Sequence, residues 1–124
     1  MLLSKFDMYA ENQEITDSTA SETVIDMIKA GDPLNDPLTL FVKVGGSFTG
    51  GGSLSCELQT SDDSNFATKK VLARSGDFSA TELKNGATIL EQKVHKGYLR
   101  YARVYFNVDG DLFTAGNVNA FYAK

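Results

Sequence analysis

Apolar and polar side chains alternate along most of the chain from residue 38 onward. Segment 38–44 places leucine or valine at every second position, and segment 53–59 repeats the pattern with Leu54, Cys56 and Leu58. Because successive side chains of a strand point to opposite faces, this period predicts β-strands with one buried face. We expect these two strands to pair across the glycine-rich segment 45–52, whose residues tolerate the tight turns of a hairpin or loop.

Further strands are predicted at 69–74, 78–83, 87–94, 98–108 and 112–123. The segments that separate them are Ser75-Gly76-Asp77, Asn85-Gly86, Lys96-Gly97 and Asp109-Gly110-Asp111. Asn-Gly and Asp-Gly are strong signals for hairpin turns. Strands that recur about every 8–12 residues are typical of a sandwich or barrel. Segment 98–108, rich in aromatic and β-branched residues, is expected in the middle of a sheet.

Residues 18–30 fit two structures. Segment 18–22 has the residue types of a helix-capping box, and Val24 and Ile28 are spaced to face a core from a helix that ends at Gly31. Segment 23–28 also alternates as a strand would. Local pattern slightly favours the helix.

Length and composition indicate a globular protein with one domain, residues 1–124. A chain of this size buries roughly two-thirds of its unfolded surface around a single core. The N-terminus lacks a basic segment followed by an apolar run, so we expect neither a signal peptide nor a membrane span. Cys56 is the only cysteine, which rules out an intrachain disulfide and disfavours secretion.

The net charge of −4 argues against a general nucleic-acid binder, which needs a surplus of basic side chains. The charge is unevenly distributed. Residues 1–36 carry eight acidic and two basic side chains, whereas residues 84–124 carry three acidic and six basic ones. These segments are complementary, and the patterning is compatible with pairing within a subunit, pairing between subunits, or simple solvation.

The chain offers little for catalysis or metal binding. His95 is the sole histidine, so we expect no nucleophilic triad and no zinc site. Segment 45–52 lacks the Lys-Ser/Thr of a phosphate-binding loop. The acidic loops lack the spacing of an EF-hand; they are Asp32…Asp36, Asp62-Asp63 and Asp109-Gly110-Asp111. We therefore expect no enzyme, no cofactor and no metal.

Several aromatic side chains cannot all lie in one core: Phe41, Phe48, Tyr98, Tyr101, Tyr105, Phe121 and Tyr122. Strand alternation puts Tyr101 and Tyr105 on one face and Phe106 on the other. The outward-facing aromatics fit either a binding surface or the partly covered outer face of a sandwich.

Short segments in a defined order carry a family resemblance. They are Phe6-Asp7, Gln13-Glu14-Ile15-Thr16, 18–26, 37–44, the 58–66 segment that ends in a polar loop closed by Phe66, 99–104 and 113–120. In this order they resemble the small capsid cement (decoration) proteins of tailed bacteriophages, of the type known from a Bordetella phage.

The resemblance implies a jelly-roll β-sandwich that assembles as a homotrimer on the virion's capsid surface and bridges major capsid protein subunits. It implies assembly in the host cytoplasm, no catalytic residue, and a strand at 23–28. Nucleic-acid and membrane partners are not expected. We expect interface residues among Leu2, Leu3, Phe6, Phe41, Tyr98, Arg100, Tyr101 and Arg103. Residues 1–12 are expected to form either an N-terminal arm on a neighbour or an edge strand of their own subunit.

A competing hypothesis is a carbohydrate- or receptor-binding β-sandwich module, since one fold hosts many functions. The chain has no tryptophan, the residue with the largest face for stacking on a sugar. A third hypothesis, an enzyme built on a carboxylate pair, has no pair that spacing singles out.

Overall fold

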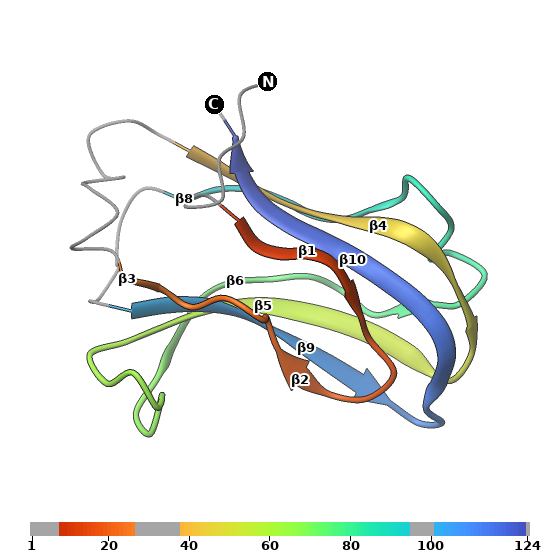
Figure 1. Cartoon of the computed structure of the whole chain (residues 1–124), viewed down its shortest axis with the longest axis horizontal. Coiled ribbons are helices and arrows are strands. Elements are labelled where there is room, and N and C mark those ends of the chain that lie inside the picture. Colours follow the sequence, from red (N-terminus) through yellow and green to blue (C-terminus); the bar gives the residue numbers. More distant parts are fainter. Residues whose placement is uncertain (1–7, 27–37, 95–100, 124) are drawn as a thin grey trace.

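The computed structural model describes residues 8–26, 38–94 and 101–123, which form an all-β sandwich of two antiparallel sheets (Figure 1). The strands, in chain order, are β1 (Met8–Glu14), β2 (Thr19–Ala20), β3 (Ile25–Asp26), β4 (Leu38–Gly50), β5 (Ser53–Ser61), β6 (Lys70–Arg74), β7 (Phe78–Ser79), β8 (Thr88–Val94), β9 (Tyr101–Asp109) and β10 (Phe113–Ala123). Sheet A has the order β1-β10-β4-β8. Sheet B has the order β2-β9-β5-β6, with β3 also paired to β9 and β7 to β5.

The strand order is that of a jelly roll. The strands pair from the ends of the chain inward: β1 with β10, β2 and β3 with β9, β4 with β8, and β5 with β6 and β7. This is the arrangement obtained when one long antiparallel hairpin is wrapped into two facing sheets. The predicted all-β, jelly-roll-like sandwich is confirmed.

The predicted pairing of segment 38–44 with segment 53–59 is wrong. β4 pairs with β10 and β8 in sheet A, whereas β5 pairs with β9 and β6 in sheet B. Gly50 and Gly51 have φ angles of 71° and 73° and turn the chain from one sheet to the other. A Cβ added to Gly51 would lie 2.5 Å from the ring of Phe113, so the crossing also needs glycine for space.

The Asn-Gly and Asp-Gly signals mark turns, but the turns do not join paired strands. Asp109-Gly110 connects β9 in sheet B to β10 in sheet A, and Asn85-Gly86 lies between β7 in sheet B and β8 in sheet A. The predicted strand 78–83 is also too long. Only Phe78–Ser79 is a strand, because the N–H of Leu83 turns back and donates to the carbonyl of Ser79 at 3.1 Å.

Residues 18–26, the described part of segment 18–30, do not form the helix that the local pattern slightly favoured. Strands β2 and β3 lie there and pair with β9. Ser21 binds sheet B twice: its N–H donates to the carbonyl of Val104 at 2.7 Å, and its Oγ accepts from the N–H of Val104 at 3.2 Å. The N–H of Thr23 donates to the carbonyl of Tyr9 in β1. These long-range bonds use backbone groups that a helix would pair locally.

The core lies between the two sheets. Its fully buried members include Tyr9, Ile15, Leu40, Val42, Leu54, Leu58, Val104, Phe106 and Val118. Phe106 faces the core whereas Tyr101 and Tyr105 are only partly buried, as alternation predicts. Phe48 also belongs to the core and meets Phe113 edge to face, with ring centroids 4.9 Å apart.

The N-terminal strand β1 pairs with β10 of the same chain. Residues 8–12 therefore belong to an edge strand of their own subunit. This was one of the two alternatives for the N-terminal segment, the other being an arm on a neighbour. Residues 1–7, with Leu2, Leu3 and Phe6, lie outside the described residues. The described part of the chain contains no helix of the length and hydropathy that crossing a membrane requires.

Replacing Phe106 with alanine is expected to lower the free energy of unfolding by about 3–5 kcal/mol, because it removes a fully buried ring from between the sheets. Urea unfolding followed by circular dichroism measures the change. The control is Leu112→Ala, at a side chain that is 56% exposed, where a change within about 0.5 kcal/mol is expected. Equal losses for both variants would contradict the assigned core.

Candidate functional site on the outer face of sheet B

The outer face of sheet B carries polar and aromatic side chains from three strands. Alternation turns outward Ser55, Glu57, Gln59 and Ser61 of β5, Tyr101, Arg103, Tyr105 and Asn107 of β9, and Arg74 of β6. Strand register places Glu57 between Tyr105 and Arg74, and Gln59 opposite Arg103. We call this set the sheet B face. Its members come from three separate parts of the sequence.

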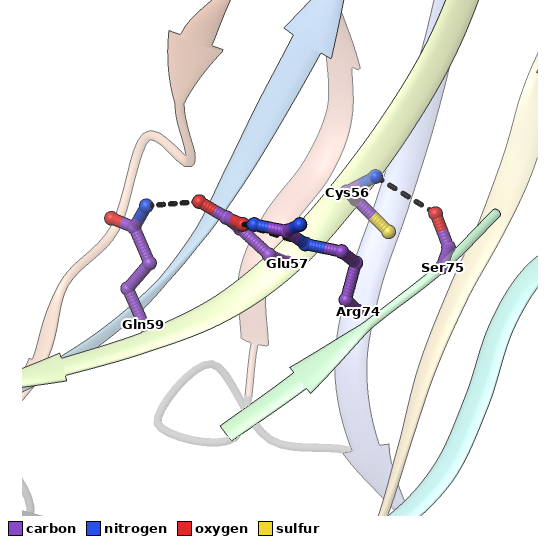
Figure 2. Close-up of polar contacts among 5 residues, drawn as sticks. All are labelled: Cys56, Glu57, Gln59, Arg74 and Ser75. Atoms are coloured by element: carbon purple, nitrogen blue, oxygen red, sulfur yellow. Dashed lines mark hydrogen bonds and ion pairs between the residues drawn. The ribbon is translucent and has the colours of Figure 1, made fainter. Parts of the chain in front are cut away.

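The centre of the sheet B face is a buried carboxylate. Glu57 is 7% exposed, and its Oε2 accepts from Arg74 Nη2 at 2.7 Å and Nε at 3.2 Å. Its Oε1 accepts from Gln59 Nε2 at 2.6 Å. Figure 2 shows the Glu57 carboxylate held between the Gln59 amide and the Arg74 guanidinium. A buried charge with both oxygens bonded avoids most of the cost of desolvation.

Gln59 extends this network to the neighbouring strand. The side chain is 1% exposed, and its Oε1 accepts from Arg103 Nε at 2.9 Å. Hydrogen bonds therefore run without a break from Arg74 on β6 through Glu57 and Gln59 on β5 to Arg103 on β9. Such a connected network holds the long arginine side chains in place, because moving one leaves a buried partner unsatisfied.

Arg103 also packs on two aromatic rings. Its guanidinium carbon lies 4.2 Å from the ring centroid of Phe66 and 5.3 Å from that of Tyr105, within range of cation–π attraction. Burial lowers the pKa of the Arg103 guanidinium, which stays charged near neutral pH. The result is a partly buried, oriented cation on the outer surface of the sandwich.

A polar loop places Phe66 over Arg103. Asp63 builds the loop: its two carboxylate oxygens accept from the N–H groups of Asn65 and Ala67, and its carbonyl accepts from the N–H of Phe66. Phe66 adopts φ 55°, a left-handed conformation rare for an aromatic residue, and is 3% exposed. The loop closed by one aromatic, noted in the sequence, is a support for the sheet B face.

A shallow hollow of about 390 Å³ lies beside the Glu57–Arg74 pair. It is lined by Ser55, Glu57, Arg74, Ser75, Gly76, Asp77 and Asn107. The lining is polar and contains no aromatic ring, which sugar binding usually uses for stacking. Among the described residues, no three His, Cys, Asp or Glu side chains lie close enough together to hold a metal ion.

Cys56 lies on the opposite, core side of β5. Its thiol is buried, and burial raises its pKa from 9.0 to about 12. Its backbone N–H donates to Ser75 Oγ at 2.9 Å (Figure 2). Since the thiolate is the reactive form, this cysteine is inert in the folded protein.

The predicted interface residues do not gather on one surface. Tyr101 and Arg103 belong to the sheet B face, whereas Phe41 lies on the outer side of sheet A, stacked on Phe121 at 5.6 Å. Tyr98 and Arg100 lie outside the described residues, as does His95. Sequence reasoning missed Glu57, Gln59, Phe66 and Arg74 as members of the site. Alternation pointed the first two outward, but their partners depend on cross-strand register.

Comparison with known proteins adds the family. The family model Bbp16 matches residues 9–122, from β1 through β10. The chain belongs to the Bbp16 family. Bbp16 is a bacteriophage protein family, in agreement with the phage resemblance noted in the sequence. No curated protein matches the chain.

Removing Arg74 should destabilise the fold by about 1 kcal/mol, because it leaves the Glu57 carboxylate with one partner fewer. The estimate is kept low because the Arg74 side chain is 68% exposed. In a Glu57→Gln background the same Arg74→Ala change should cost clearly less. Urea unfolding of the four proteins of this double-mutant cycle measures the difference. An equal cost in both backgrounds would show that the pair is not coupled.

Cys56 should resist alkylation in the folded protein. At pH 8, with a pKa of about 12, on the order of one thiol in ten thousand is ionised. Iodoacetamide labelling followed by mass spectrometry is expected to be slow in buffer and fast in urea. Because the folded pKa lies above the unfolded one, the thiol's contribution to stability is complete below pH 9 and is lost as the pH rises towards 12. Fast native labelling at pH 8 would refute the assigned burial.

Proposed function

We propose that this protein is a structural component of a bacteriophage virion that decorates and cements the capsid by bridging major capsid protein subunits. It acts as a homotrimer and catalyses no reaction. Membership of the Bbp16 family supports the phage assignment. The cementing role rests on the resemblance described above and on the surface chemistry of the fold.

The observation that carries the proposal is the sheet B face. It presents Arg103, Tyr101 and Tyr105 from one strand, with Arg103 held by Gln59 and packed on Phe66. Arginine and tyrosine are enriched at protein–protein interfaces and among the residues that dominate binding energy. Side chains already fixed in the free protein lose less conformational entropy on binding. The surface is therefore built for contact with another protein.

A jelly-roll sandwich also suits a bridging role. Its two sheets face outward on opposite sides, and sheet A presents the Phe41–Phe121 stack with Lys43 over the Phe41 ring at 5.4 Å. A subunit with contact surfaces on both sides can touch two neighbours at once. Repeating one such heterologous contact around a three-fold axis closes a trimer.

The binding-module alternative has one feature in its favour, the hollow beside Glu57 and Arg74. The lining of this hollow lacks an aromatic platform, and the nearby Tyr105 ring contacts Arg103. We therefore prefer the cementing role.

The purified protein should be a trimer at micromolar concentration and should bind shells of its major capsid protein to a fixed, saturable number per shell. Light scattering and cosedimentation measure the two properties. Tyr105→Ala, on the sheet B face, should weaken the binding to shells or the trimer by about tenfold or more. Lys93→Ala on β8 is the control and should change neither. A wild-type protein that stays monomeric and fails to bind shells would contradict the proposal and favour the binding module.

A further inference from the structure

Arg103 forms no ion pair with a carboxylate of the described residues. Among the described residues the ion pair formed is Arg74–Glu57, and the side-chain hydrogen bond of Arg103 to these residues uses its Nε. The nearby Glu57 carboxylate is already bonded through both oxygens. The terminal nitrogens of Arg103 therefore remain available. A guanidinium fixed by flanking rings presents these two donors to a carboxylate in a bidentate geometry.

A complementary set of charges lies on β1 and on the segment around β2, which neighbours β9 in sheet B. Glu11, Glu14, Asp17 and Glu22 are exposed along β1 and the segment that leads into and past β2. We call these four residues the acidic edge. No lysine, arginine or histidine occurs between residues 8 and 26.

Two hydrogen bonds hold the acidic edge together. The N–H of Glu11 donates to Glu22 Oε1 at 2.9 Å, and the N–H of Glu22 donates to Gln13 Oε1 at 2.8 Å. These bonds tie β1 of sheet A to the segment beside sheet B. Glu11 and Glu22 are thereby held side by side, and an opposing cation would relieve the repulsion among the carboxylates.

The symmetry of a contact decides how the two surfaces meet. A two-fold contact of the sheet B face with itself brings Arg103 side chains together, and a two-fold contact between acidic edges opposes carboxylates. Like charges disfavour both arrangements. A contact that pairs the face of one copy with the acidic edge of another avoids this repulsion, and in a head-to-tail arrangement such contacts form a ring where the rotation closes.

We propose that the sheet B face binds the acidic edge of a second copy of this chain, with a carboxylate of that copy bound to Arg103. The site around Arg103 is then completed by the neighbouring subunit. This inference rests on the proposed self-assembly and names the surfaces that form it. Phe66 and Tyr105 shield the resulting ion pair from water, so it contributes more than an exposed surface pair does.

Charge reversal tests the contact. The face variant is Arg103→Glu, and the edge variant replaces all four residues of the acidic edge with arginine, each at an exposed side chain. Each reversal places like charges at every contact, so each variant should be monomeric in analytical ultracentrifugation under conditions where the wild type is assembled. A chain that carries both the face and the edge substitutions has the two charges of every contact exchanged. It should therefore assemble again and show the mass of the wild-type oligomer. Lys93→Glu and Glu91→Arg on β8 are matched controls that should remain assembled.

An equimolar mixture of the face and edge variants gives a second readout. The mixture allows two kinds of favourable contact: Arg103 of the edge variant on the acidic edge of the face variant, and the charge-swapped pair of the two altered surfaces. A head-to-tail mixed dimer contains one of them. A three-membered ring cannot alternate two kinds of subunit, so the mixture should form a mixed dimer rather than a closed trimer. The conservative Arg103→Gln variant should weaken assembly by about tenfold, which tests the contact even where the reversed charge prevents folding.

The inference is overturned if the face variant, folded by circular dichroism, keeps the wild-type mass. It is equally overturned if the combined variant stays monomeric although each variant folds, or if the wild type itself is monomeric. Binding to capsid shells is scored separately on the wild type. Trimers that bind shells but ignore these substitutions would refute the assigned contact and leave the cementing role intact.

Discussion

The pairing of β5 with β9 is the interaction on which both the core and the candidate site depend. The two strands pair over nine consecutive residues without a bulge, from Ser53 opposite Asp109 to Ser61 opposite Tyr101. The inward side buries Leu58 and Val104 completely, and the outward side brings Gln59 opposite Arg103. A slip of one residue would exchange the two faces, so the burial of the core also sets the geometry of the polar surface.

The sheet B face shows how a polar surface is kept ordered. Glu57 and Gln59 point away from the core and are still buried, and each bonds to an arginine of a flanking strand. The Arg74 side chain is mostly exposed to solvent, although its guanidinium pairs with Glu57. Glu57 and Gln59 bond to each other within β5 and to the arginines of the flanking strands β6 and β9. The network therefore depends on the sheet and in turn holds Arg103 in a fixed orientation.

Local sequence signals correctly predicted where the chain turns, but they wrongly predicted that the strands on either side of each turn pair with each other. Gly50-Gly51, Asn85-Gly86 and Asp109-Gly110 all reverse the chain, with positive φ at each glycine. A reversal of this kind is compatible with a hairpin and with a crossing between sheets. In a jelly roll most successive strands lie in different sheets, so the same turn chemistry leads to another partner. Residues 18–26 illustrate the same limit, since bonds from Ser21 to Val104 and from Thr23 to Tyr9 override a local pattern that slightly favoured a helix.

The sequence by itself determined the all-β class, most strand positions and which side chains of a strand share a face. These follow from the two-residue period of a strand and the conformational freedom of glycine, which are local properties. Only the tertiary structure decided which strands pair, because pairing depends on contacts between distant segments. The register that joins Glu57 to Arg74, and the loop that places Phe66 on Arg103, belong to this second group. The candidate site is built from such contacts, and for that reason the sequence alone named only Tyr101 and Arg103 of it as interface residues, with Tyr105 among the outward-facing aromatics.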